Sequence, residues 1–468
     1  MNVMHNRLMA LAFLLCALTP PSYSQDNEVM DLAITNVSVI DVVSGGVSRQ
    51  SVLVNEGKIA RVLDPGESVG PSVEVIDGTG QFLLPGLWDM HVHIVYEAQL
   101  IQQMPDLFLD YGVTSVRDTG ALLANIQPEL ARWRALGAAA PDIFFSGPLL
   151  DGRLVVYDGN GRTEIGRSNA TAQAARNQVA ALVAAGVDFI KIYELVSPEV
   201  FAALVESAGA ANIPIAAHVP LSMMAEAAGP RVQSMEHLRN IEIACADDAE
   251  SLFDAREAMI ESPGDRSGYE LRRYLHQTQR EVALTTADPE SDRCQRVIES
   301  LKGTIQVPTL RLNTLPQYSP IRRSDWRDAL RDLPGALASQ WIETAEFFAG
   351  QETSVSDQLS SWSLELVDAM QQAGVPIGAG TDTPIGQAIP GYSLHTELER
   401  LVDAGLSERQ ALFAATVVPA MFLELEGVMG QIKPEMEADL IVLSDNPLDN
   451  IKHTRTIQAV ISDGVRVR

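Results

Sequence analysis

Trp88-Asp89-Met90-His91-Val92-His93 is the segment from which the architecture of this chain can first be inferred. His91 and His93 are two residues apart, so in a β-strand both imidazoles lie on the same face. Neutral imidazole is a good ligand for Zn²⁺ and its first-row neighbours. The pair therefore indicates a metal site on a strand, although a His-x-His pattern alone is only moderately specific.

Short apolar runs, each followed by a helix-like stretch, recur around this segment. They are residues 82–84, 113–116, 143–145, 187–190, 213–216, 232–235, 305–307 and 375–377. The Ala-rich segments 170–185 and 199–211 between them have helical composition. Eight alternating strand and helix units predict an α/β fold, a (β/α)₈ barrel of the TIM type.

The two ends of the chain have a different character. Residues 32–77 and 438–467 contain short β-branched segments separated by Gly and Asn turn signals. We expect a small β-sandwich built from both termini. The predicted organisation is a leader at 1–24, sandwich at 25–81, barrel at 82–425 with an insertion at 241–304 over its mouth, and sandwich again at 426–468.

Charge and length exclude several classes of protein. The 468 residues carry a formal net charge of −27, and so acidic a surface repels phosphate backbones and anionic membranes. We expect a small-molecule substrate rather than nucleic acid. A homo-oligomer and a monomer both remain open.

The N-terminus has the pattern of a secretory signal peptide. Arg7 precedes the apolar run 8–18, and Ser22 and Ser24 stand before a plausible cleavage point. The run is too short to span a bilayer, so we expect a periplasmic or secreted protein with no membrane span in its mature form.

Two cysteines, Cys245 and Cys294, remain once residues 1–24 are removed. In an oxidising compartment an even number of cysteines favours a disulfide, which would stabilise the fold by about 4 kcal/mol on the loop-entropy model. Two unlinked buried thiols are the alternative.

Further polar residues stand at the ends of the predicted strands. Lys191, His218, His237 and Asp382 each end or follow one of the apolar runs. The carboxyl ends of barrel strands are where active sites of this fold lie. Together with the first histidine pair, these residues predict a divalent-metal centre.

Lys191 needs its own explanation, because an ammonium at the end of a buried strand is expensive to desolvate. Two answers are open. The side chain could stay charged as the partner of a substrate carboxylate, or it could react with CO₂ to form a carbamate, an anion able to bridge two metals.

The sequence resembles the amidohydrolase superfamily, in the imidazolonepropionase-related group that includes Xaa-Pro dipeptidases and ochratoxin-hydrolysing amidases. The matching segments are 58–62, 84–93, 112–118, 380–382, 414–416, 430–432 and 438–440. Val418 replaces the usual Asn after Ala-Ala-Thr, and residues 435–437 replace a usual Pro-Gly turn. Neither departure affects a proposed ligand.

The resemblance implies a binuclear metal-dependent hydrolase acting on carbon–nitrogen bonds. Such a hydrolase binds two divalent ions, and Zn is the expected metal. His91, His93 and Asp382 would hold the first ion, and His218 and His237 the second. N6-carboxylated Lys191 and a hydroxide would bridge the two ions. Such a hydroxide exists near neutral pH because metals lower the pKa of bound water. Asp382 would move the proton from water to the leaving nitrogen, or serve only as a ligand.

Other candidates are weaker. Tyr193 could bind a substrate carbonyl or carboxylate, or pack at the barrel rim. Arg311 could pair with a substrate carboxylate, although a surface salt bridge is the better explanation. His395 either takes part in catalysis or supports the eighth loop, whereas His276 and His453 lie in polar stretches and are expected to be solvated.

Three functions remain open at this point. The first is an exported amidohydrolase of dipeptides or N-acyl amino acids. The second is a mononuclear deaminase or hydrolase of cyclic amidines or lactams, which would not need Lys191 and usually shows a His-x-x-Glu pattern that is absent at His237. The third is a non-catalytic periplasmic binding protein, which the complete ligand set argues against.

Overall fold

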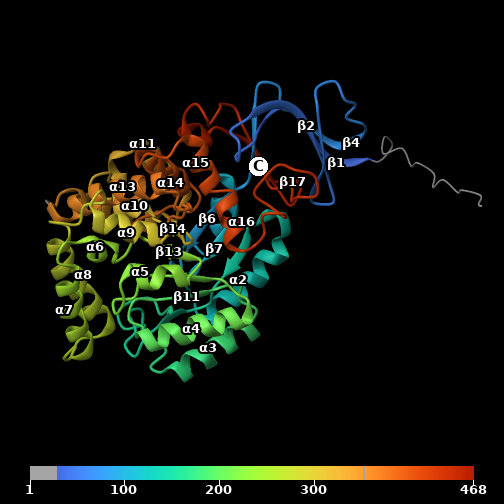
Figure 1. Cartoon of the computed structure of the whole chain (residues 1–468). Coiled ribbons are helices and arrows are strands. Elements are labelled where there is room, and N and C mark those ends of the chain that lie inside the picture. The colour runs from blue at the N-terminus through green and yellow to red at the C-terminus, as the bar shows by residue number, and fades with distance from the viewer. Residues whose placement is uncertain (1–28, 352–353) are drawn as a thin grey trace, which may run out of the picture.

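A computed structural model describes residues 29–351 and 354–468 of the chain. The predicted leader at 1–24 lies outside the described residues. In Figure 1 the strands β1 (Met30–Ile40), β2 (Val47–Asn55) and β4 (Ser72–Asp77) lie at one end of the molecule, close to the C-terminus. The helices α7 (Ala249–Glu261) and α8 (Gly268–Ala283) lie on the far side of the helical body.

An eight-stranded sheet combines the two ends of the chain. Its order is β17-β16-β15-β5-β1-β2-β3, with β4 paired to β1. The strands not yet located are β3 (Lys58–Leu63), β5 (Phe82–Pro85), β15 (Leu440–Leu443), β16 (Ile457–Ser462) and β17 (Val465–Arg466). The predicted assembly of both termini into one β-structure is therefore present as a sheet.

The position of β5 corrects one prediction. Residues 82–84 were expected to form the first barrel strand, but they lie in β5, which pairs with β1 and, antiparallel, with β15. The first strand of the central region is instead β6 (Leu87–Val92). Gly86 separates the two, and a Cβ there would lie 2.1 Å from Thr114 Oγ1, so only glycine allows this close approach.

The central region consists of parallel strands. One sheet has the order β6-β7-β8, with β7 (Val113–Asp118) and β8 (Asp142–Phe145). The other has the order β10-β9-β11-β12-β13-β14. Its strands are β9 (Leu149–Asp151), β10 (Gly166–Ser168), β11 (Ile190–Ile192), β12 (Ile215–Ala217), β13 (Ser234–Glu236) and β14 (Ile305–Val307). β9 and β10 were not predicted, and the expected strand at 375–377 is reduced to a bridge between Ile377 and Gln306.

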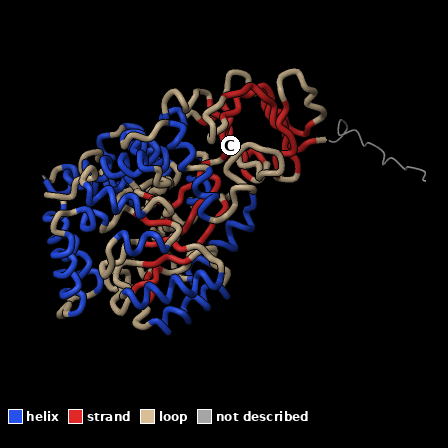
Figure 2. The backbone as a smooth tube through the Cα atoms, viewed as in Figure 1, coloured by secondary structure: helices blue, strands red, loops and turns tan. Residues whose placement is uncertain are grey.

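Helices surround these strands (Figure 2). Outside the insertion they are α1 (Met104–Asp110), α2 (Leu123–Leu136), α3 (Ala172–Ala184), α4 (Pro198–Ala211), α5 (Ala225–Ala228), α10 (Leu310–Asn313), α11 (Ser324–Ala329), α12 (Gly335–Ala349), α13 (Ser354–Ala373), α14 (Tyr392–Asp403), α15 (Glu408–Ala414) and α16 (Val417–Phe422). The start of α4 follows local chemistry, since Ser197 accepts a hydrogen bond from the Val200 amide and Pro198 needs no partner at the first position.

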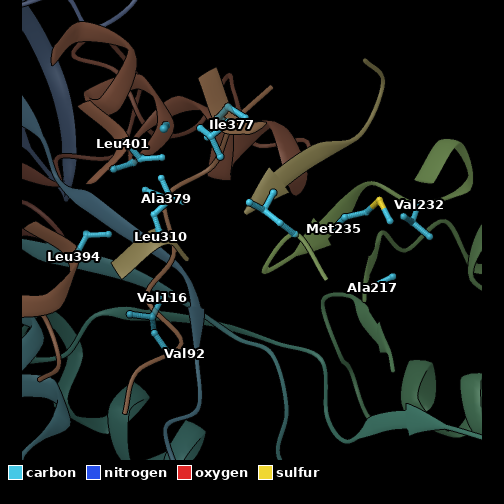
Figure 3. Packing of buried hydrophobic residues seen from close by; sticks show 14 of the residues in the cluster. Val92, Val116, Ala217, Val232, Met235, Leu310, Ile377, Ala379, Leu394 and Leu401 are labelled. Carbon is cyan, nitrogen blue, oxygen red and sulfur yellow. The ribbon is translucent and has the colours of Figure 1, made fainter. Parts of the chain in front are cut away.

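Burial of apolar side chains joins the strands to the helices. Val92 and Val116 from neighbouring strands belong to the same buried cluster as Leu394 and Leu401 of α14 (Figure 3). This core fixes the carboxyl ends of the strands, where the predicted site residues lie. Within the described part of the chain, none of the helices has the length and hydropathy needed to cross a bilayer.

The segment predicted as an insertion is helical. It contains α6 (Ile241–Cys245), α7, α8 and α9 (Asp292–Ser300). Ser267 and Glu270 form a reciprocal capping box that starts α8. In the structure a disulfide joins Cys245 of α6 to Cys294 of α9.

Candidate metal centre

The six predicted ligands line one cavity of about 160 Å³: His91, His93, Lys191, His218, His237 and Asp382. They lie in or directly after β6, β11, β12 and β13, with Asp382 on the loop before α14, and all are buried. The histidine rings contact one another, with ring centroids 4.4 Å apart for His91 and His237 and 4.8 Å apart for His218 and His237. The structure therefore brings together residues that are almost 300 positions apart in the sequence.

Asp382 lies against the first histidine pair. Its Oδ1 is 3.3 Å from His91 Nε2 and 3.2 Å from His93 Nε2. Potential donor atoms of His91, His237 and Asp382 all lie within 4.8 Å of one another, a spacing that suits convergence on one ion. Although burial opposes ionisation, the interactions of Asp382 with His237, His91 and His93 hold its pKa well below the usual range.

The Nδ1 atom of each histidine in the cavity is occupied by a partner within the protein. The contacts are His91 Nδ1 with Glu236 Oε2 at 2.6 Å, His93 Nδ1 with Gly120 O at 3.2 Å, His218 Nδ1 with Glu194 Oε1 at 2.8 Å, and His237 Nδ1 with Thr309 Oγ1 at 2.7 Å. Such contacts orient the rings and direct Nε2 at a metal. Burial lowers the pKa of His218 to about 3 and that of His237 well below its usual range, so both rings are neutral, as ligands must be.

Glu236, immediately before His237, connects this set to Arg117. Its Oε1 accepts hydrogen bonds from Arg117 Nη2 and Ser234 Oγ, both at 2.8 Å. Burial opposes its ionisation, but the Arg117 guanidinium holds its pKa well below the usual range. The carboxylate is therefore charged and keeps the His91 ring in place.

Glu194 keeps the His218 ring in place, as Glu236 does for His91. It also accepts hydrogen bonds from Arg272 Nε at 2.9 Å and from His276 Nε2 at 2.7 Å, both on α8. The prediction that His276 is solvated is therefore wrong, because the ring is buried against a carboxylate. The insertion helix thus reaches the metal centre through Glu194.

The surroundings of Lys191 show whether the cavity fits a carboxylated lysine and metal ions. The Lys191 Nζ is buried and has no hydrogen-bond partner among the described residues, and the Glu236 carboxylate is 4.0 Å away. Burial lowers the pKa of Lys191 to about 8. A lone buried ammonium is unfavourable, whereas a carbamate beside neutral imidazoles and Asp382 makes a suitable donor set for divalent ions. The residues present therefore fit the group.

Backbone geometry at two ligands is unusual. His237 has φ 64° and Asp382 has φ 60°, in the left-handed region that residues other than glycine seldom adopt. Each is fixed by its own amide, which donates to Val307 O at 2.8 Å and to His91 O at 2.7 Å, respectively. Such conformations cluster at functional sites.

Aromatic, apolar and basic side chains complete the cavity wall. Besides the six ligands, it is lined by Tyr96, Leu149, Tyr157, Ile165, Tyr193, Arg239, Arg272, Leu312 and Ile385. The Tyr193 ring lies 4.5 Å from that of His218, and burial raises the pKa of Tyr193 well above its usual value, so it remains a hydrogen-bond donor.

Two predicted residues do not line the cavity. His395 is buried elsewhere, with Nδ1 2.8 Å from Thr454 Oγ1 and Nε2 2.9 Å from Tyr111 O, so its position does not support a catalytic role. Arg311 is buried and is not part of a surface salt bridge. Its guanidinium donates to carbonyl oxygens of the loop after Asp382, those of Thr381, Ile385 and Gly386.

Sequence reasoning missed the charged residues that support the site. Glu194 and Glu236 are each adjacent to a predicted site residue, Tyr193 or His237, and this adjacency was an available signal. Arg239 and Arg272 carry no such signal, since their place on the wall depends on tertiary packing.

Comparisons with known proteins concern the family and the fold of the chain. A profile of the amidohydrolase family matches residues 155–468, more than half of the chain. A segment of 96 residues, 20% of this chain, is 32% identical to the adenine deaminase of Moorella thermoacetica, and the match spans only 16% of that enzyme.

Similar solved structures include a Xaa-Pro dipeptidase with bound methionine, with TM-score 0.66, 20% identity and coverage of 93% of this chain and 99% of that one. The ochratoxinase of A. niger has TM-score 0.63, 19% identity and coverage of 94% and 96%. At these identities the likeness concerns the fold, while the profile match concerns the family. The chain belongs to the amidohydrolase family.

Proposed function

We propose that this protein is an exported amidohydrolase with a binuclear metal centre, which hydrolyses the amide bond of small substrates such as dipeptides or N-acyl amino acids. The observation that carries the proposal is the orientation of four histidines around one cavity. Each has its Nδ1 engaged by the protein, beside Asp382 and an unpartnered Lys191. Family membership supports hydrolysis of a carbon–nitrogen bond.

We also propose that the parallel strands close into a (β/α)₈ barrel and that the terminal sheet forms the small β-sandwich. Three contacts between segments support closure. Val92 of β6 bridges Thr383, Gln306 of β14 bridges Ile377, and the Asp188 amide donates to Phe145 O of β8. The boundary between sandwich and barrel then lies at Gly86 rather than at residue 82.

The metal ligands divide into two groups. His91, His93 and Asp382 would hold the first ion, and His218 and His237 the second, with carboxylated Lys191 between them. When bound, divalent ions supply Lewis acidity toward the substrate carbonyl and make a water molecule acidic enough to react near neutral pH.

The protein's own groups then act on the amide. The Asp382 carboxylate takes a proton from the attacking water as the new C–O bond forms, and it returns that proton to the leaving nitrogen as the C–N bond breaks. Tyr193, kept protonated by its burial, donates a hydrogen bond to a substrate oxygen. The products are a carboxylic acid and an amine.

Two features of the protein support export. The leader pattern at residues 1–24 supports it, and the Cys245–Cys294 disulfide is of the kind that persists in oxidising compartments. We propose the periplasm or the medium as its location.

A deaminase is the second candidate, favoured by the local similarity to adenine deaminase. A mononuclear deaminase has no use for carboxylated Lys191. Metal content distinguishes the candidates: about two ions per chain for the hydrolase, about one for the deaminase, and none for a non-catalytic binding protein.

The test is a panel of dipeptides, N-acetyl amino acids and adenine, offered to zinc-reconstituted protein. Release of amino acids, loss of activity after chelation and loss of activity in Asp382→Asn are expected. Ammonia release from adenine with no amide hydrolysis would establish the second candidate instead, and full turnover after exhaustive chelation would overturn both metal-dependent schemes.

A further inference from the structure

We propose that Arg239 binds the carboxylate of the substrate and so restricts the enzyme to small amides that carry an anionic group. The inference rests on the proposed function and narrows its substrate class. Arg239 lies two residues beyond His237 and lines the same cavity as the six proposed ligands.

Of the two arginines on this wall, Arg272 is paired with Glu194, whereas Arg239 has no ion pair among the described residues. Its Nε is buried without a hydrogen-bond partner, and no carboxylate in residues 29–351 or 354–468 forms an ion pair with it. A buried donor left without a partner is unfavourable, and more so when it is charged. A carboxylate entering the cavity could satisfy several of the five N–H donors of the guanidinium at once.

The neighbouring arginines are already paired. Arg272 donates to Glu194 at 2.9 Å, and Arg280 donates to Glu242 at 2.9 Å. Arg311, the sequence-based candidate for this role, is committed to three backbone carbonyls. Arg239 is therefore the available anion partner beside the metal centre.

The remainder of the cavity fits a small substrate with an apolar side chain. Tyr96, Tyr157 and Ile165 lie on its wall with Leu312 and Ile385. The volume of about 160 Å³ is below the roughly 300–1,000 Å³ usual for pockets that take drug-sized ligands. A dipeptide or an N-acyl amino acid has the required combination of one carboxylate, one amide and a compact apolar group.

The test compares two substrates that differ only in the carboxylate, N-acetyl-leucine and N-acetyl-isoamylamine, in zinc-reconstituted protein. We expect Arg239→Gln to lower kcat/KM for N-acetyl-leucine about 10- to 100-fold, chiefly through KM, as expected for loss of a hydrogen bond to a charged group. Turnover of N-acetyl-isoamylamine should not change. Arg239→Lys should recover part of the loss, and Arg273→Gln, at an exposed position on α8, is the matched control.

Metal content and thermal unfolding establish that Arg239→Gln folds and holds its ions like the parent protein. Equal loss on both substrates would indicate a structural role and overturn the inference, as would a wild-type enzyme that does not discriminate between them. That second result would leave amide hydrolysis intact.

A binding measurement that needs no turnover distinguishes failure of the Arg239 proposal from failure of the proposed amide hydrolysis. Calorimetric titration with N-acetyl-leucine should show weaker binding in Arg239→Gln and unchanged binding in Arg273→Gln, even if no substrate is hydrolysed. Identical affinities for N-acetyl-leucine in the parent protein and Arg239→Gln would overturn the role of Arg239.

Discussion

His218 and His276 bind opposite oxygens of one buried carboxylate: His218 Nδ1 lies 2.8 Å from Glu194 Oε1, and His276 Nε2 lies 2.7 Å from Glu194 Oε2. One histidine follows strand β12 at the metal centre, and the other is on α8 of the insertion. The insertion therefore helps to position a proposed metal ligand that it does not itself supply.

Replacing His276 tests this relationship. We expect His276→Ala to weaken metal binding about 10- to 100-fold, because the partners that orient a ligating histidine contribute on that scale. Competition with a chelator measures the effect, and His453→Ala, at a partly buried position whose ring contacts Asn446 O, is the control. Unchanged metal affinity would show that α8 only covers the site.

Substitution of Lys191 distinguishes a carbamate that holds metal from a cation that binds substrate. Two divalent ions bring four positive charges, against which Asp382 and one hydroxide supply two negative ones, so an ammonium would increase an excess that a carbamate reduces. Lys191→Ala should lose one metal and activity together, and short carboxylic acids should restore part of both. Retention of two ions, with a raised KM for anionic substrates alone, would identify Lys191 as a substrate-binding cation.

Acidic side chains at the junction of the terminal sheet and β8 predict how stability depends on pH. Burial, with the charges of Asp463 and Glu437, raises the pKa of Asp142 to about 7. Ionisation then costs more in the folded than in the unfolded state. The contribution of Asp142 to stability is thus complete below pH ~4 and is lost as the pH rises through 7.

Asp142→Asn should therefore raise the unfolding midpoint at pH 8 and leave it nearly unchanged at pH 4. Thermal unfolding across this range measures the difference, with Asp254→Asn on the exposed face of α7 as the control. A variant that is stabilised equally at both pH values would contradict the electrostatic explanation.

The disulfide between Cys245 and Cys294 closes a long loop across the insertion. Its removal by Cys294→Ala should destabilise the protein by about 4 kcal/mol on the loop-entropy model. Digestion without reductant should yield the linked peptides in mass spectrometry. Complete alkylation of both thiols before reduction would rule out the bond.

The convergence of the six proposed ligands on one cavity could be predicted from the sequence because each stands next to a short apolar run, and parallel strands bring such positions to one edge. The contacts that support these residues could not be predicted, because they join distant elements. Glu236 and His91 are 145 positions apart in the sequence, and His276 and Glu194 are 82 positions apart. The position of His395 away from the cavity could not be predicted for a related reason. Its helix α14 directs the ring at Tyr111 and Thr454, and spacing along a chain does not reveal which neighbour a helix face meets.

The pairing of β5 with both β1 and β15 has a consequence for the order in which the protein can fold. Ribosomes make a chain from its N-terminus, so β1 to β5 exist long before β15 is synthesised. Throughout that interval one edge of β5 has unpaired amides and carbonyls, which can pair with another chain. A nascent or C-terminally shortened chain therefore exposes this edge to aggregation, and β15, synthesised late, covers the edge of the early strand β5.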